Sequence, residues 1–396
     1  MKKIISALLT VSLSVFVSVS CDNRRSSGWE AIRFVGEAVA DTNPAVLGML
    51  RNFDERRTEG TIAVIGEVRR GAVLADGFLS GDNYDNVDGR TAPDGLPDFA
   101  GETVAVLLDE VNSPYGGTMT GEGELKLREV TVRNALMALD TMVRTTPYDR
   151  ENLVWKAPAK VIVLSSPLMS EFGYYDLDTL CRIECKDVPV ISPVHAMMKQ
   201  AFASHGDTVN IGVWSDRTML GSGAYRSVFD RMMTKERAAS TLTEFCPDTT
   251  GFAGDRLLRF LEMYRRAGAG RRLDVLLIDD PDAGRPQLEA RLKEIRRAES
   301  FSMMNYNELL SPEFEFIDVT EAVQSECYRL MRERNLFTHY VAAPKVSFYQ
   351  TIVDEEHPGD APYTLIELNG RYLDRDTKQF LEANSTAYRD YVSNQY

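Results

Sequence analysis

Short apolar runs recur along the chain and alternate with amphipathic helical patterns. Seven of these runs have the length and composition of buried strands: TIAVIGEV from Thr61, ETVAVLLDEV from Glu102, AKVIVLSS from Ala159, VPVIS from Val188, VNIGVWS from Val209, LDVLLIDD from Leu273 and FEFIDV from Phe314. Apolar spacings of three and four predict helices between them, at residues 127–143, 255–266, 287–298 and 321–334. Strands that alternate with helices form parallel sheets through right-handed crossovers. The sequence therefore predicts an α/β fold, and 396 residues are enough for two or three domains.

Polar side chains end two of these runs. Ser165 and Ser166 close the run from Ala159, and Asp279 and Asp280 close the run from Leu273. Ligands bind at the carboxyl ends of strands in open α/β sheets. The two serines at a helix start can receive a carboxylate, whereas the two aspartates favour an ammonium group. Helix capping is the more common role of such serines, and a solvated turn or a cap is the more common role of such aspartates.

The first twenty residues have the composition of an export signal. Lys2 and Lys3 precede an apolar stretch over residues 4–19, which is short for a membrane span and has the length of a secretory h-region. Cys21 follows at the expected cleavage point, which resembles the signal of a bacterial lipoprotein. We expect residues 1–20 to be a signal peptide and Cys21 to carry a lipid that holds the protein at an envelope membrane, on its periplasmic or outer-surface face. Plain cleavage nearby is the alternative, and residues 21–57 are predicted to form a tether and a helical segment.

The charge balance argues against nucleic acid as a partner. Acidic side chains number 59 against 45 basic ones, which gives a net charge of −14. Such a chain repels phosphate backbones, and no basic block with interleaved aromatic residues is found.

Cysteine and histidine usage does not predict a metal site. The four histidines are scattered singly, and the Asp-rich segment 75–102 does not fit the EF-hand register, so we expect a solvated acidic loop there. Beyond the signal, small buried residues or disulfides are expected, with the pairing left open, at Cys181, Cys185, Cys246 and Cys327.

Five segments, taken in order, resemble the aspartate/glutamate racemase superfamily and its glutamate racemases. The segments are LPDFAGETVAVLLDEVNSPYGG at 96–117, VPVISPVHAMMKQAF at 188–202, IGVWSDRTMLGSGAY at 211–225, EFCPDTTGF at 244–252 and FEFIDVTEAVQSECYRLM at 314–331. The resemblance covers roughly residues 58–340, and it rests on the shared order of the segments.

The resemblance implies two similar parallel-sheet lobes that face a central cleft. Residues 58–186 with 331–396 would form lobe 1, and residues 187–330 would form lobe 2. Part of the chain after residue 340 would complete lobe 1, and we expect its Tyr-rich remainder to serve packing. In this family one cysteine from each lobe removes or delivers the α-proton on opposite faces of the substrate carbon, and no cofactor is implied.

Both cysteine positions of the family carry other residues in this chain. The first-lobe Cys-Asn-Thr turn matches Ser165-Ser166-Pro167, and the second-lobe Cys-Thr-His turn matches Asp279-Asp280-Pro281. A serine hydroxyl is a far weaker acid than a thiol, and an ordinary aspartate is a poor base for a weak carbon acid. The sequence therefore argues against a two-cysteine racemase.

The remaining family positions are kept only in part. The first Asp-Ser-Gly turn matches Gly66-Glu67-Val68, and a threonine of the family falls on Met219. The Pro-Tyr-Gly turn is intact as Pro114, Tyr115 and Gly116, which the resemblance places among ligand-binding positions.

Three functions stay open at this stage, and enzymatic activity is not the favoured one. The first is an envelope-anchored binding or structural protein whose cleft holds an amino acid or small carboxylate, or holds nothing. The second is an isomerase, racemase, lyase or hydrolase with altered chemistry, with Asp279 as base, Ser165 or Ser166 as donor or nucleophile, and His195 as an approaching group. The third is a two-lobed solute-binding lipoprotein.

Overall fold

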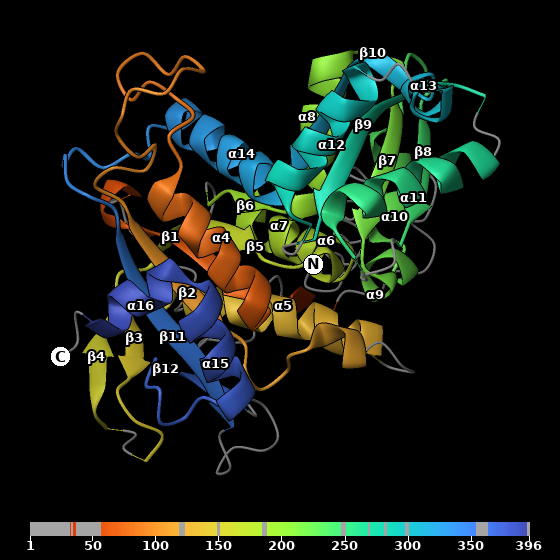
Figure 1. Ribbon diagram of the computed structural model, residues 1–396. Coiled ribbons are helices and arrows are strands. Elements are labelled where there is room, and N and C mark those ends of the chain that lie inside the picture. The colour runs from red at the N-terminus through yellow and green to blue at the C-terminus, as the bar shows by residue number, and fades with distance from the viewer. Residues whose placement is uncertain are drawn as a thin grey trace, which may run out of the picture.

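The computed structural model describes two α/β lobes, each built on its own sheet (Figure 1). The described residues are 32, 35–36, 57–118, 123–148, 151–183, 188–246, 251–267, 270–280, 283–297, 301–353 and 363–393. The predicted α/β class with two mainly parallel sheets is confirmed. Cys21, the expected signal peptide and most of the expected tether lie outside the described residues.

The larger sheet has eight strands in the order β4-β3-β12-β11-β2-β1-β5-β6. Its strands are β1 (Thr61–Gly66), β2 (Thr103–Leu108), β3 (Met142–Arg144), β4 (Leu153–Trp155), β5 (Ala159–Leu164), β6 (Val190–Ile191), β11 (Lys345–Val353) and β12 (Tyr363–Glu367). The five strands from β11 to β6 are parallel, which puts their carboxyl ends at one edge. β1 and β5 are buried throughout, as their unbroken apolar runs require.

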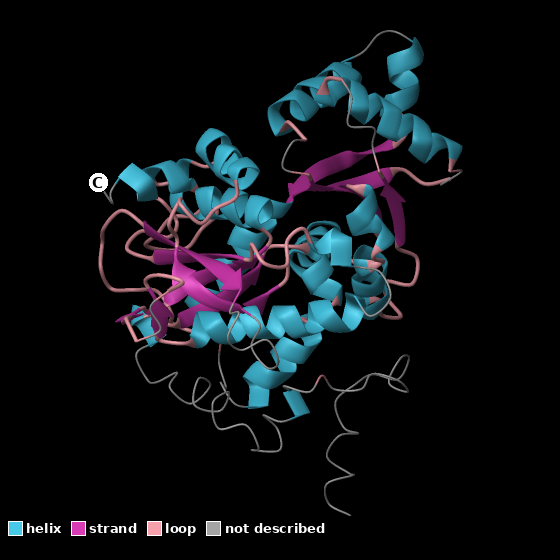
Figure 2. Ribbon diagram, turned by 90° about the horizontal axis from the view of Figure 1, so that it is seen from below, coloured by secondary structure: helices cyan, strands magenta, loops and turns pink. Residues whose placement is uncertain are grey.

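Helices cover both faces of the larger sheet (Figure 2). One group packs around α4 (Val68–Ser80) and contains α14 (Val319–Glu333), α15 (Arg375–Asn384) and α16 (Thr386–Ser393). The other group contains α5 (Gly123–Leu139), α6 (Pro167–Glu171) and α7 (Tyr174–Ile183). The helix predicted over 127–143 ends earlier, at Leu139, because residues 142–144 form β3 at the margin of the sheet.

The smaller sheet has four parallel strands in the order β10-β9-β7-β8. Its strands are β7 (Asn210–Ser215), β8 (Thr241–Phe245), β9 (Leu273–Asp279) and β10 (Leu310–Asp318). Its helices are α8 (Pro193–His205), α9 (Arg217–Gly221), α10 (Ala224–Met232), α11 (Ala253–Arg266), α12 (Arg285–Arg297) and α13 (Phe301–Asn307). A separate apolar core around Trp214, Phe260 and Leu276 joins this sheet to α11, α12 and α13.

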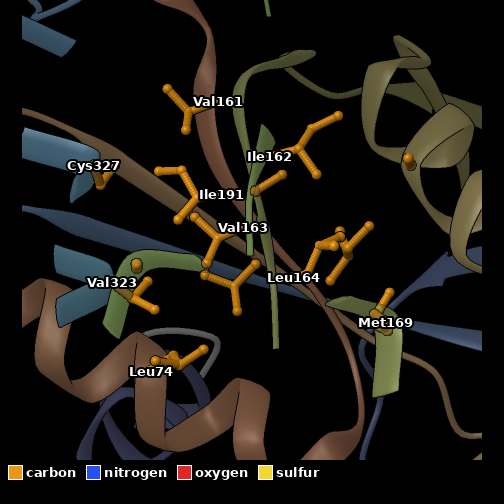
Figure 3. Packing of buried hydrophobic residues seen from close by; sticks show 14 of the residues in the cluster. Leu74, Val161, Ile162, Val163, Leu164, Met169, Ile191, Val323 and Cys327 are labelled. Carbon is orange, nitrogen blue, oxygen red and sulfur yellow. The ribbon is translucent and has the colours of Figure 1, made fainter. Parts of the chain in front are cut away.

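Helix α14 connects the two lobes. It starts from β10 of the smaller sheet and packs against β5 and β6 of the larger one. Figure 3 shows Val323 and Cys327 of this helix beside Val161 and Val163 of β5. The boundary expected at residue 187 stays a prediction, and β6, which follows it, hydrogen-bonds to β5.

Candidate functional site

Turns from both sheets meet where the strands end. The Pro-Tyr-Gly turn of the first lobe reaches α9 of the second so closely that a Cβ atom added at Gly116 would lie 2.5 Å from Thr218 Cγ2. Nearby, Ser166 Oγ lies 3.9 Å from Met219 Sδ. The sequence-predicted turns of the two lobes are therefore brought together, with the carboxyl ends of β1, β2 and β5 on one side and those of β7 and β9 on the other.

Asp279, the last residue of β9, is fully buried and surrounded by donors. Ser215 Oγ donates to Asp279 Oδ2 over 2.9 Å, the Tyr225 hydroxyl donates to the same oxygen, and Arg70 Nη1 donates to Oδ1. Burial raises the pKa of Asp279, while Arg70 and the two hydroxyl groups oppose that rise. The carboxylate of Asp279 is therefore held in place by donors from both lobes.

Arg70 forms ion pairs between the two lobes. It lies on the first turn of α4 in lobe 1, and besides Asp279 it contacts Asp216 of lobe 2 through Nη2 at 3.2 Å. Burial opposes its charge, but Asp279, Tyr225, Glu67 and Asp216 raise the pKa of Arg70 above its ordinary value. The guanidinium is therefore permanently charged and lies between carboxylates of both lobes.

The two serines have different surroundings. Ser166 is the N-cap of α6, and its Oγ accepts a hydrogen bond from Leu168 N over 3.4 Å. Ser165 is 3 % exposed, and its Oγ has no hydrogen-bond partner. A nucleophilic serine needs a base within hydrogen-bond reach, and the described contacts of Ser165 contain none.

The Pro-Tyr-Gly turn is tied to lobe 1 through Tyr115. The Tyr115 hydroxyl donates to Asp109 Oδ2 over 3.0 Å, and its amide donates to Glu67 Oε1 over 2.9 Å. Asp109 is fully buried and also accepts from Asn112, Asn134 and Thr351. The phenol of Tyr115 is therefore engaged within its own lobe.

Asp280 faces away from Asp279. Its Oδ2 accepts from Trp214 Nε1 over 3.2 Å and lies 3.5 Å from Arg256 Nη1, both in lobe 2. The two aspartates thus do not form a joint carboxylate pair, and Asp279, expected in a solvated turn or cap, is the more buried of the two.

His195 hydrogen-bonds to Ser192 and Tyr175, and not to the two serines of the β5 turn. Its Nδ1 is 2.8 Å from Ser192 Oγ, and its Nε2 is 2.8 Å from Tyr175 Oη. Burial, followed by the charges of Lys199 and Arg231, lowers the pKa of His195 to about 3. Both ring nitrogens of His195 therefore have hydrogen-bond partners, one on α7 and one at the N-cap of α8.

The thiols of the described chain lie elsewhere. Cys327 is buried in α14, with its Sγ 3.7 Å from Met331 Sδ, and Cys181 is buried in α7. Cys246 follows β8, and Cys185 lies outside the described residues. The described residues contain no group of three or more His, Cys, Asp or Glu side chains arranged for a metal ion.

Sequence reasoning did not single out Arg70, Ser215, Tyr225 or Asp109. A signal was present for three of them, because Arg70 follows the end of β1 by four residues, Ser215 ends β7 and Asp109 follows β2. Tyr225 is the last residue of the segment IGVWSDRTMLGSGAY. What the sequence did not reveal is that Arg70, Ser215 and Tyr225 converge on the carboxylate of Asp279.

Among known proteins, the chain is similar only to solved structures. No protein-family model and no curated protein matches the chain. Glutamate racemase from Francisella tularensis in complex with D-glutamate is 12% identical with a TM-score of 0.47, covering 83% of this chain and 96% of that one. The RacE1 isoform of glutamate racemase from Bacillus anthracis is 14% identical with a TM-score of 0.43, covering 74% and 89%. The enzyme from Aquifex pyrophilus is 14% identical with a TM-score of 0.40, covering 73% and 88%.

Proposed function

We propose that this protein is an envelope-anchored binding protein with a glutamate racemase-like fold, which holds a small amino acid or carboxylate where its two lobes meet. It does not carry out two-thiol racemisation. The observation that supports this most is the state of Asp279, which stands at a position that the family resemblance assigns to a thiol. Three donors from both lobes hold its carboxylate, and the described contacts of Asp279 include no thiol.

The opposite turn supports the same conclusion. Ser165 stands at the other thiol position and has no base beside it. An α-proton is removed from one face and replaced on the other only if both faces carry an acid or base of suitable pKa. Ser165 has no base among its described contacts, and the carboxylate of Asp279 is already bound by Arg70, Ser215 and Tyr225.

The anchoring part of the proposal rests on Cys21 and the apolar stretch before it. None of the helices described has the length and hydropathy of a membrane span. A Cys21→Ser variant is expected to leave the membrane fraction when cells are lysed and fractionated, since the acyl chains attach at that sulfur. Full retention of the variant in the membrane fraction would contradict anchoring at this residue.

The binding part is tested by a thermal-shift screen of the full chain, purified in a non-ionic detergent, against D- and L-amino acids and dicarboxylates. A ligand that binds only the folded protein stabilises it by RT ln(1 + c/Kd), where c is the ligand concentration, so the unfolding temperature rises with ligand concentration. We expect at least one compound of the panel to do so. If none does, the protein is not a binder of this class.

A further inference from the structure

Two buried polar atoms at the ends of β1 and β5 have no hydrogen-bond partner. They are Ser165 Oγ and Glu67 Oε2, in residues that are 3 % and 9 % exposed. A buried polar group without a partner costs about 1–3 kcal/mol, so native proteins retain few of them. Other buried atoms without a partner occur elsewhere in the described residues, but these two lie at the carboxyl ends of neighbouring parallel strands, where α/β sheets bind ligands.

Ser165 and Glu67 flank the same short stretch of backbone. Gly66 lies between them in space, because β1 and β5 are paired up to Ile65 and Leu164. A Cβ atom added at Gly66 would lie 2.7 Å from Ser165 Oγ, so the hydroxyl points over the end of β1. Glu67 is the next residue of that chain segment.

The second carboxylate oxygen of Glu67, Oε2, accepts no hydrogen bond. Its Oε1 accepts from Tyr115 N, but Oε2 lies 3.9 Å from Arg70 Nε, which is too far for a hydrogen bond. The two terminal nitrogens of Arg70 are turned to Asp216 and Asp279 instead. The guanidinium of Arg70 therefore donates no hydrogen bond to Glu67 Oε2.

Negative charge dominates the surroundings of these two atoms. Glu67, Asp109, Asp216 and Asp279 lie in one hydrogen-bonded and ion-paired group with Arg70. A carboxylate brought into this group meets like charges, whereas an ammonium group meets opposite ones. The side chain of Asp216 is half exposed, which places it at the solvent side of the group.

We propose that the turns after β1 and β5 bind the primary ammonium group of a small amine, such as a basic amino acid or a diamine, and reject dicarboxylates. The ammonium donates to Glu67 Oε2 and Ser165 Oγ. This inference rests on the proposed binding function. It restricts the amino acids to those with a single carboxylate and adds diamines to the ligand class.

The test is isothermal titration of the full chain in non-ionic detergent with L-lysine, putrescine, L-glutamate and succinate. We expect lysine and putrescine to bind and glutamate and succinate to bind at least tenfold more weakly or not at all. Glu67→Gln should weaken amine binding about tenfold, which corresponds to about 1.4 kcal/mol. Glu124→Gln, the same change at an exposed position of α5, should leave it unaltered.

Ser165→Ala separates binding from folding. It removes a buried hydroxyl that has no partner, so the unfolding temperature should stay the same or rise while the affinity for lysine falls several-fold. Tighter binding of glutamate or succinate than of the amines would overturn this inference and leave the proposed function standing. Unchanged amine affinity in Glu67→Gln would also overturn it, and failure of all four probes together with the wider panel would overturn both.

Discussion

The ion pair between Arg70 and Asp279 gives the sharpest prediction about this fold. Replacing Arg70 by Met keeps an unbranched side chain of similar length and removes the charge. Asp279 is 0 % exposed, so the variant buries a carboxylate whose cationic partner is gone. Removing one partner of a buried pair typically costs about 3–5 kcal/mol. Tyr225 and Ser215 still donate to Asp279, so we expect the lower end, about 3 kcal/mol.

The loss in Arg70→Met should depend on pH. Without Arg70, burial is left as the main influence and raises the pKa of Asp279 further above its unfolded value. The folded variant then binds a proton that the unfolded chain does not, so its free energy of unfolding rises as the pH falls through that window. The penalty should therefore shrink as the pH falls towards the unfolded pKa of an aspartate, by about 1.4 kcal/mol for each additional pKa unit.

Urea unfolding followed by circular dichroism measures these effects. Asp279→Asn is the matched control, because it removes the charge but leaves Arg70 its contact with Asp216. The double variant should be more stable than Arg70→Met alone, since no unpaired carboxylate remains. If Arg70→Met unfolds like the wild type at about pH 8 and shows no extra pH dependence, the pair does not hold the lobes as described.

Two further predictions concern the same edge of the larger sheet. Burial, with Asp374 beside it, raises the pKa of Glu110 to about 7, so this group lowers the free energy of unfolding as the pH rises from about 4.5 to about 7. Glu110→Gln should reduce the slope in unfolding titrations. A wild-type slope that persists in the variant would refute the assignment. Gly116→Ala should cost about 1–3 kcal/mol, because the new Cβ collides with Thr218 Cγ2, and less in a Thr218→Ser background, which lacks that methyl group. Equal losses in both backgrounds would show that the two turns do not touch.

The strands were predictable wherever burial is complete. All seven apolar runs named from the sequence contain strands, because a parallel strand covered on both faces must be apolar throughout. The short marginal strands β3 and β4 were missed, since Leu153 and Trp155 are exposed and their pattern does not differ from that of a loop. β8 was missed for a similar reason, as only Leu242 and Phe245 are buried in TLTEF.

The sequence predicted which residues lie at the strand ends, but it did not predict which residues they contact. The sequence predicted Ser165 and Asp279 at strand ends in opposite lobes, and in the structure the turn after β5 contacts α9 while Asp279 pairs with Arg70 of α4. It did not identify the partner of Asp279, because Arg70 is 209 residues away along the chain. An aspartate after a strand is compatible with a solvated turn and with a buried ion pair, and only the tertiary fold distinguishes the two.

Exchange of the α-proton in deuterated water tests most directly whether this fold has lost two-thiol chemistry. Glutamate of either handedness is incubated with the full chain, and the intensity of the α-proton signal is followed by NMR. The signal should decay no faster than in a protein-free sample. Faster decay that disappears in Asp279→Asn would contradict the account, because it would show Asp279 removing a proton while it is bound by Arg70, Tyr225 and Ser215.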